Sequence, residues 1–122
     1  MKNSTIAVDF DGTVVDHTYP EVGEDVPNAV RVLKQLIKNG NKIVLFTMRS
    51  GKELQDAVEW FEKNDIELYG INNNPTQHNW TDSPKAYANL YIDDSAFGCP
   101  LIKVSGFCKK CVDWEYVERK LL

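Results

Sequence analysis

Short apolar runs alternate along this chain with amphipathic helical patterns, and this alternation restricts the fold more than any other feature. Five runs are dense in β-branched or aromatic residues and predict strands: Ile6–Phe10, Lys42–Thr47, Glu67–Ile71, Leu90–Ile92 and Leu101–Val104. Strands that alternate with helices pair in parallel, because each helix carries the chain back to the start of the next strand. The sequence therefore predicts an α/β fold. We expect a three-layer, Rossmann-like arrangement with a mostly parallel five-stranded sheet and helices on both faces.

Helical patterns are expected in the segments between and after these runs. Pro27–Asn39 carries one apolar stripe, and Gly40 follows as a C-terminal stop. A second helix is expected to begin after Ser50, with an acidic residue three positions later as in a capping box. A third, shorter helix is expected to open at Ser83, where a proline follows, and the last spans Asp113–Leu121.

Length and charge restrict the class of protein. A chain of 122 residues suits one domain, so residues 1–122 are expected to share one core. The formal net charge of −4 argues against general attraction to nucleic acid or to anionic membranes. No apolar run has the length of a membrane span, and the first residues do not have the pattern of a signal peptide. We therefore expect a cytoplasmic protein that does not enter a membrane.

The three cysteines do not predict a disulfide framework, because their number is odd. Cys108 and Cys111 form a Cys-Lys-Lys-Cys run, which is half of a zinc site or a redox pair. The further zinc ligands would have to come from Cys99, His17 or His78. A structural role for these cysteines is the simpler interpretation, and the sequence assigns them no function.

Polar side chains gather at the predicted strand ends. They are Asp9 and Asp11 after the first strand, Thr47 and Arg49 after the second, and Asp93 and Asp94 after the fourth, with Lys85 shortly before it. In parallel sheets, ligands bind at the carboxyl ends of the strands. Carboxylates there suit Mg²⁺, and hydroxyl and cationic groups suit phosphate oxygens. Each residue taken alone also fits a turn, a helix cap or a solvated surface position, so the interpretation depends on their joint placement.

These residues carry a family resemblance. Asp9-Phe10-Asp11-Gly12-Thr13 matches the Asp-x-Asp-Gly-Thr signature of the haloacid dehalogenase-like (HAD-like) superfamily of Mg²⁺-dependent phosphohydrolases. Leu45–Arg49 is similar to the second motif of that superfamily, and Tyr91–Asp94 is similar to its acidic fourth motif. Lys85 is the best match for the lysine of the third motif, with Lys52 as the substitute. The chain thus resembles a small member of this superfamily.

The resemblance implies an Mg²⁺-dependent phosphatase that hydrolyses a phosphomonoester through an aspartyl-phosphate. Asp9 would be the nucleophile, and Asp11 would carry the proton. Mg²⁺ would be held by Asp9, by the backbone carbonyl of Asp11 and by Asp93, while Asp94 would orient a metal-bound water or support the lysine. The phosphate oxygens would be bound by Thr47, Lys85 and Arg49. An arginine at a helix entrance is equally expected to pair with a nearby carboxylate, so that alternative stays open for Arg49.

The gaps between the motifs leave no room for a cap domain. Thr13–Thr47 and Thr47–Lys85 are both filled by the predicted helices, strands and loops. A capless site admits large substrates, or it takes a lid from another subunit of a homo-oligomer. The phosphorylated substrate is therefore either a small molecule or an exposed phosphate on a macromolecule. Two alternatives use the same residues: a phosphotransferase, and a regulatory module that binds phosphate or metal without turnover.

Overall fold

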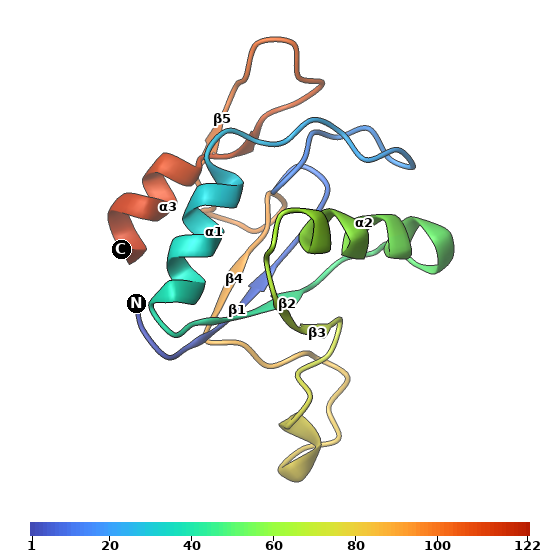
Figure 1. Cartoon of the computed structure of the whole chain (residues 1–122), viewed down its shortest axis with the longest axis vertical. Helices are drawn as coiled ribbons and strands as arrows, with labels where there is room; N and C mark the ends of the chain where they lie inside the picture. The colour runs from blue at the N-terminus through green and yellow to red at the C-terminus, as the bar shows by residue number, and fades with distance from the viewer.

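The structure, a computed structural model that describes residues 1–122, is built around a parallel sheet (Figure 1). The sheet has four strands in the order β3-β2-β1-β4, and every neighbouring pair is parallel. The strands are β1 (Thr5–Val8), β2 (Lys42–Leu45), β3 (Leu68–Ile71) and β4 (Leu90–Ile92). This confirms the α/β class and the mostly parallel sheet. Because β1 and β2 end earlier than predicted, Asp9 and Thr47 lie just beyond the strands.

The predicted fifth strand does not join this sheet, so the prediction of a five-stranded sheet is wrong. Leu101–Ile102 forms β5, which pairs antiparallel with β6 (Cys111–Val112) in a separate two-stranded sheet. A parallel neighbour of β4 would need a crossover of about a dozen residues or more. The link from Ile92 to Leu101 is shorter than that. The chain therefore turns back on itself in a hairpin, whose long loop projects from the molecule (Figure 1).

Three α-helices complete the fold. They are α1 (Ala29–Lys38), α2 (Gly51–Lys63) and α3 (Trp114–Leu121). The expected helices at these three places are thereby confirmed, and α1 and α3 lie side by side (Figure 1). None of the helices combines the length and the apolar character that crossing a bilayer requires.

No helix opens at Ser83, contrary to the prediction. A single 3₁₀ turn, η1 (Gln77–Asn79), is followed by extended chain. The side-chain amide of Gln77 donates to the carbonyls of Ser83 and Lys85, at 3.0 and 2.7 Å, and accepts from the N–H of Tyr87 at 2.7 Å. These backbone groups are bound to a side chain and so do not form helical hydrogen bonds. The Ser-Pro pair favours a helix start here, but the hydrogen bonds to Gln77 hold the segment extended.

The structure does not confirm helices on both faces of the sheet. Alternate strand residues such as Ile6 and Val8 point to one face, where they join a single apolar cluster. That cluster also contains the buried residues of all three helices, including Leu33, Phe61 and Trp114. The physical reason is that β1, β2 and β3 follow one another in one direction across the sheet. Right-handed crossovers then place α1 and α2 on the same face.

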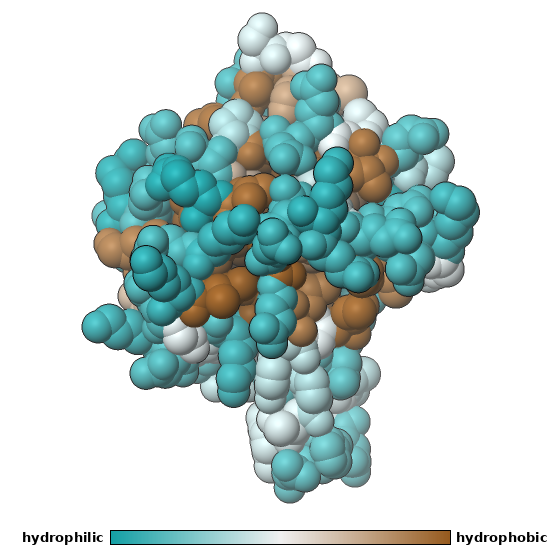
Figure 2. Space-filling model, viewed as in Figure 1, coloured by the Kyte–Doolittle hydropathy of each residue, from teal (hydrophilic) through white to brown (hydrophobic).

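The opposite face is covered without a helix. Ala7 of the central strand is flanked by Val44 of β2 and Tyr91 of β4. The small Ala7 side chain lets the rings of Phe46 and Tyr91 approach to 6.0 Å between centroids. The Tyr91 hydroxyl donates to the Ala86 carbonyl at 2.7 Å, which ties the extended segment before β4 to this face. Residues 72–89 then form the arm at the bottom of Figure 1, which Figure 2 shows as mostly hydrophilic or neutral.

We predict that Trp114 of α3 is a main stabilising side chain. Its exposed fraction is 0%, and its indole N–H donates to the carbonyl of Thr13 at 2.6 Å. Trp114→Ala should lower the free energy of unfolding by about 3–5 kcal/mol, because it leaves a cavity and an unpaired carbonyl. Urea denaturation followed by circular dichroism measures the change. Tyr116→Ala in the same helix is the matched control, since Tyr116 is 39% exposed. Equal losses in the two variants would contradict the prediction.

Candidate active site

Three carboxylates meet at the carboxyl ends of β1 and β4. Asp9 follows β1, and Asp93 and Asp94 follow β4, the neighbouring strand. One carboxylate oxygen from each residue lies within 4.8 Å of the other two. The backbone N–H of Asp9 also donates to the carbonyl of Ile92 at 2.9 Å, so the parallel pairing continues past β1. Strand pairing thus brings together residues that are more than 80 positions apart in the sequence.

The surroundings of Asp9 disfavour its charged form. Burial is the largest cause, and a hydrogen bond with Asp94 and the charge of Asp93 act in the same direction, raising the pKa of Asp9 to about 8. A hydrogen bond from Thr13 acts in the opposite direction. The carboxylates of Asp9, Asp93 and Asp94 offer three oxygen ligands and no cation balances their negative charge, which suits a hard divalent cation. The residues therefore fit Mg²⁺ in donor type and in charge.

Gly12 and Thr13, which follow β1, pack directly against the acidic cluster. The Thr13 hydroxyl donates to Oδ2 of Asp9 at 2.9 Å, and its oxygen accepts from the backbone N–H of Asp94 at 3.2 Å. Gly12 has φ +81°, and a Cβ there would lie 2.2 Å from the ring of His17 and 2.5 Å from Oδ2 of Asp94. Only glycine fits this position, because it has both the left-handed backbone and the close neighbours.

Thr47 lies beside the acidic cluster, where a phosphate-binding residue is expected. With Phe46 and Met48, it lines a small cavity of about 130 Å³ that Asp9 and Asp93 also line. The backbone N–H of Thr47 donates to the side chain of Asn72 at 2.7 Å, and its hydroxyl oxygen accepts from the N–H of Arg49 at 3.2 Å. The Thr47 hydroxyl donates to no group of the protein, so its proton is available to an acceptor in the cavity.

Neither candidate lysine lines this cavity. Lys85 is exposed, and its ammonium lies 5.5 Å from the ring centroid of Tyr91, on the face opposite the helices. Lys52, at the start of α2, has a side chain that is 80% exposed and forms an ion pair with Asp56 at 3.1 Å. Lys85 thus contacts Tyr91, whose ring in turn lies against Phe46 of the cavity lining, and it forms no ion pair with the acidic cluster.

Arg49, which the sequence suggests as a phosphate-binding residue, has all its donors occupied within the protein. Its Nε donates to Oδ2 of Asp11 at 2.8 Å, and one terminal nitrogen donates to Oδ1 at 2.7 Å. The remaining donors bind the backbone carbonyls of Pro20, Glu21 and Glu53. A guanidinium has five N–H donors, and all of them have partners here. The side chain is only 1% exposed, so no donor is left for a substrate.

The same contact takes the Asp11 side chain out of the acidic cluster. The cluster consists of Asp9, Asp93 and Asp94, and the Asp11 carboxylate lies on Arg49 instead. As a metal ligand, Asp11 can therefore contribute only through its backbone carbonyl, as the family resemblance implies. Its side chain is 23% exposed, so it is still accessible from solvent.

His17 lies beside the site, in the loop after the Asp-x-Asp-Gly-Thr motif that the sequence suggests at the site entrance. Its Nε2 lies 3.2 Å from Oδ2 of Asp94 and 3.3 Å from the carbonyl of Lys110. The sequence also offers His17 as a zinc ligand together with cysteines, but the structure groups no cysteine with it. No spacing signal was available, because the loop of His17 is held by Asp16, which accepts from the N–H of Cys108 at 3.2 Å. The three cysteines are free.

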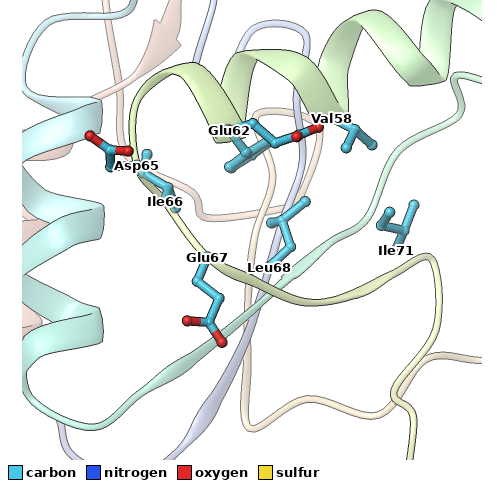
Figure 3. Close-up of a pocket in the computed structure, with 8 residues that line it drawn as sticks. Val58, Glu62, Asp65, Ile66, Glu67, Leu68 and Ile71 are labelled. Carbon is cyan, nitrogen blue, oxygen red and sulfur yellow. The ribbon is translucent and has the colours of Figure 1, made fainter.

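A larger groove lies elsewhere on the surface, between α2 and β3 (Figure 3). Its volume is about 540 Å³, and Val58, Leu68 and Ile71 contribute apolar side chains to it. Figure 3 shows the carboxylates of Asp65 and Glu67 pointing outward from this apolar lining, and Figure 2 shows hydrophobic atoms below α2 at the same place. The groove contains no cationic side chain. It also contains no hydroxyl, whereas the cavity beside Asp9 has that of Thr47, so the groove is the less suited of the two to phosphate.

Comparison with family models found no match, and comparison with curated proteins found none either. Among solved structures, the chain is similar to a conserved protein coded by a locus from Bacteroides thetaiotaomicron. The two are 36% identical in sequence and superpose with a TM-score of 0.81. The match covers 98% of this chain and 90% of the other. This degree of identity over nearly the whole length shows that the chain belongs to the family of that conserved protein.

Proposed function

We propose that this chain is an Mg²⁺-dependent phosphatase that hydrolyses a phosphomonoester through an aspartyl-phosphate, as the resemblance to the HAD-like superfamily implies. One observation carries the proposal above the others. The half-buried carboxylate of Asp9 opens, beside Asp93 and Thr47, onto a cavity of about 130 Å³, which suits a phosphoryl group. Larger parts of a substrate would lie outside the cavity, where no cap domain covers the site.

The metal would be held by the side chains of Asp9 and Asp93 and by the backbone carbonyl of Asp11, with Asp94 in supporting contact. Bound Mg²⁺ would supply positive charge that offsets the three carboxylates and the phosphoryl oxygens. The support for this assignment is the cluster itself, since three carboxylates this close are unfavourable without a counterion.

In the first step, a carboxylate oxygen of Asp9 forms a bond to phosphorus while the bond to the leaving oxygen breaks. Thr13 holds Oδ2 of Asp9 at 2.9 Å and so fixes the orientation of the nucleophile. The Thr47 hydroxyl donates to a phosphoryl oxygen. Lys85 is the better of the two lysines for neutralising the phosphate, because its ammonium has no carboxylate partner, whereas Lys52 is paired with Asp56.

In the second step, water attacks phosphorus, the bond from phosphorus to Asp9 breaks, and inorganic phosphate leaves. Asp11 is the residue assigned to accept the proton of that water. Its pairing with Arg49 is consistent with this role, because each carboxylate oxygen has a second lone pair and the side chain is 23% exposed. Donating a proton to the leaving oxygen in the first step would require the Asp11–Arg49 pair to open.

We predict that Asp9→Asn loses turnover of 4-nitrophenyl phosphate by roughly 10³-fold or more, because the amide cannot form the aspartyl-phosphate. Steady-state hydrolysis with Mg²⁺ measures the loss. Asp82→Asn, an exposed carboxylate on the arm, is the matched control and should keep full activity. Full turnover by Asp9→Asn would remove the nucleophile assignment. A phosphoryl group that stays on the native protein for many minutes would favour the regulatory module instead.

We also predict that Mg²⁺ raises the melting temperature more at pH 8 than at pH 5. The pKa of Asp9 is about 8 in the folded protein against 3.8 ordinarily, so the metal-free protein loses stability as the pH rises between these values. Mg²⁺ binds the ionised carboxylates and offsets that loss, and at pH 5 it must first displace a proton. Thermal melts in Mg²⁺ and in EDTA at both pH values measure the difference.

The control for this melting experiment is Asp93→Asn, which removes one carboxylate of the cluster while leaving Asp9 in place. This variant should show a much smaller Mg²⁺ effect at pH 8. An equal Mg²⁺ shift at both pH values, or an unchanged shift in Asp93→Asn, would contradict metal binding at this cluster.

A further inference from the structure

We propose that Arg49 is a positioning residue of this site, which holds the Asp11 carboxylate in one orientation and does not contact the phosphate. This role depends on the proposed function, because Asp11 needs an orientation only if it transfers protons. Arg49 differs in this respect from Thr47, which lines the cavity directly. Arg49 lies outside that lining.

The hydrogen bonds of Arg49 leave it no other role. Its five N–H donors are divided between the two oxygens of Asp11 and three backbone carbonyls. A phosphate oxygen would have to displace one of these acceptors inside the protein, where an unpaired acceptor is costly. The two side chains also differ in access, since Arg49 is 1% exposed and Asp11 is 23% exposed. Of the two side chains, only that of Asp11 is accessible to a substrate.

The guanidinium is itself held from several directions. The carbonyls of Pro20 and Glu21 belong to the loop after the Asp-x-Asp-Gly-Thr motif, and the carbonyl of Glu53 belongs to the first turn of α2. The guanidinium carbon also lies 4.9 Å from the ring centroid of Phe10 and 5.1 Å from that of Tyr19. The loop and the helix thus fix the position of the guanidinium, and the guanidinium fixes the Asp11 carboxylate.

This geometry requires arginine rather than any cation. A lysine ammonium carries the same charge, but it cannot form two parallel hydrogen bonds to one carboxylate and three more in the same plane. Without the planar fork, the Asp11 carboxylate would rotate about its own side-chain bonds. A small misplacement of a proton-transfer group lowers the rate without weakening substrate binding.

The test compares Arg49→Met, Arg49→Lys, Asp11→Asn and the double variant Asp11→Asn/Arg49→Met, with 4-nitrophenyl phosphate and Mg²⁺. We expect Arg49→Met to lower kcat by roughly tenfold or more while KM stays within about twofold. Arg49→Lys should restore only part of kcat. The double variant should be no slower than Asp11→Asn alone, because both changes act through the same carboxylate.

Arg31→Met is the matched control, since Arg31 is an exposed arginine paired with Glu118 and contacts neither the acidic cluster nor Asp11. Its kcat and KM should match those of the native chain. Thermal melts accompany each variant, because Arg49→Met leaves the Asp11 charge without its partner. If Arg49→Met fails to fold, the same comparison is made with Arg49→Lys and Asp11→Asn/Arg49→Lys.

Two results would overturn this role of Arg49 alone. A rise in KM of about tenfold with unchanged kcat would show that Arg49 binds the phosphate. Losses in kcat that multiply in the double variant would show that Arg49 acts independently of Asp11. A native chain without any phosphatase turnover would instead overturn the proposed function, and the role of Arg49 with it.

Discussion

Strand β1 pairs with β2 on one side and with β4 on the other, and most of the molecule depends on this central position. Its alternate residues Ile6 and Val8 enter the apolar cluster that all three helices cover. Ala7 points to the other face, where its small side chain lets Phe46 and Tyr91 meet. The next residue in that alternation, Asp9, is the first beyond the strand and enters the site. Core, second face and site are thus consequences of one strand and its two neighbours.

The site is locally unfavourable for the fold without a counterion, which links its structure to its proposed chemistry. Burial and two neighbouring carboxylates oppose the charge of Asp9, while one hydroxyl, from Thr13, supports it. Nothing in the hydrogen bonding of the cluster requires three acids at this place. A cation that joins them would recover the lost stability and would leave Asp9 ionised, as a nucleophile must be.

Arginine and lysine in this region show how one type of charge takes different roles. Arg49 is buried, and its hydrogen bonds all stay within the protein, whereas Lys85 is exposed and has no acidic partner. The sequence places both near the strand ends and so suggests phosphate contact for both. Burial separates the two, because a charge enters the interior only with its hydrogen bonds satisfied. The Asp11 carboxylate accepts two of the hydrogen bonds of Arg49, and its side chain is therefore not part of the acidic cluster.

The sequence by itself determined the parallel strands, three of the helices and the meeting of Asp9, Asp93 and Asp94. These follow from local apolar periodicity and from the rule that parallel strands end at one edge. Tertiary structure alone decided the partner of Arg49, which lies 38 residues away, and the placement of His17 beside Asp94. It also decided the hairpin of β5 and the extended chain after Gln77. Such contacts depend on how loops pack over the sheet, and this packing cannot be predicted from the periodicity of apolar residues.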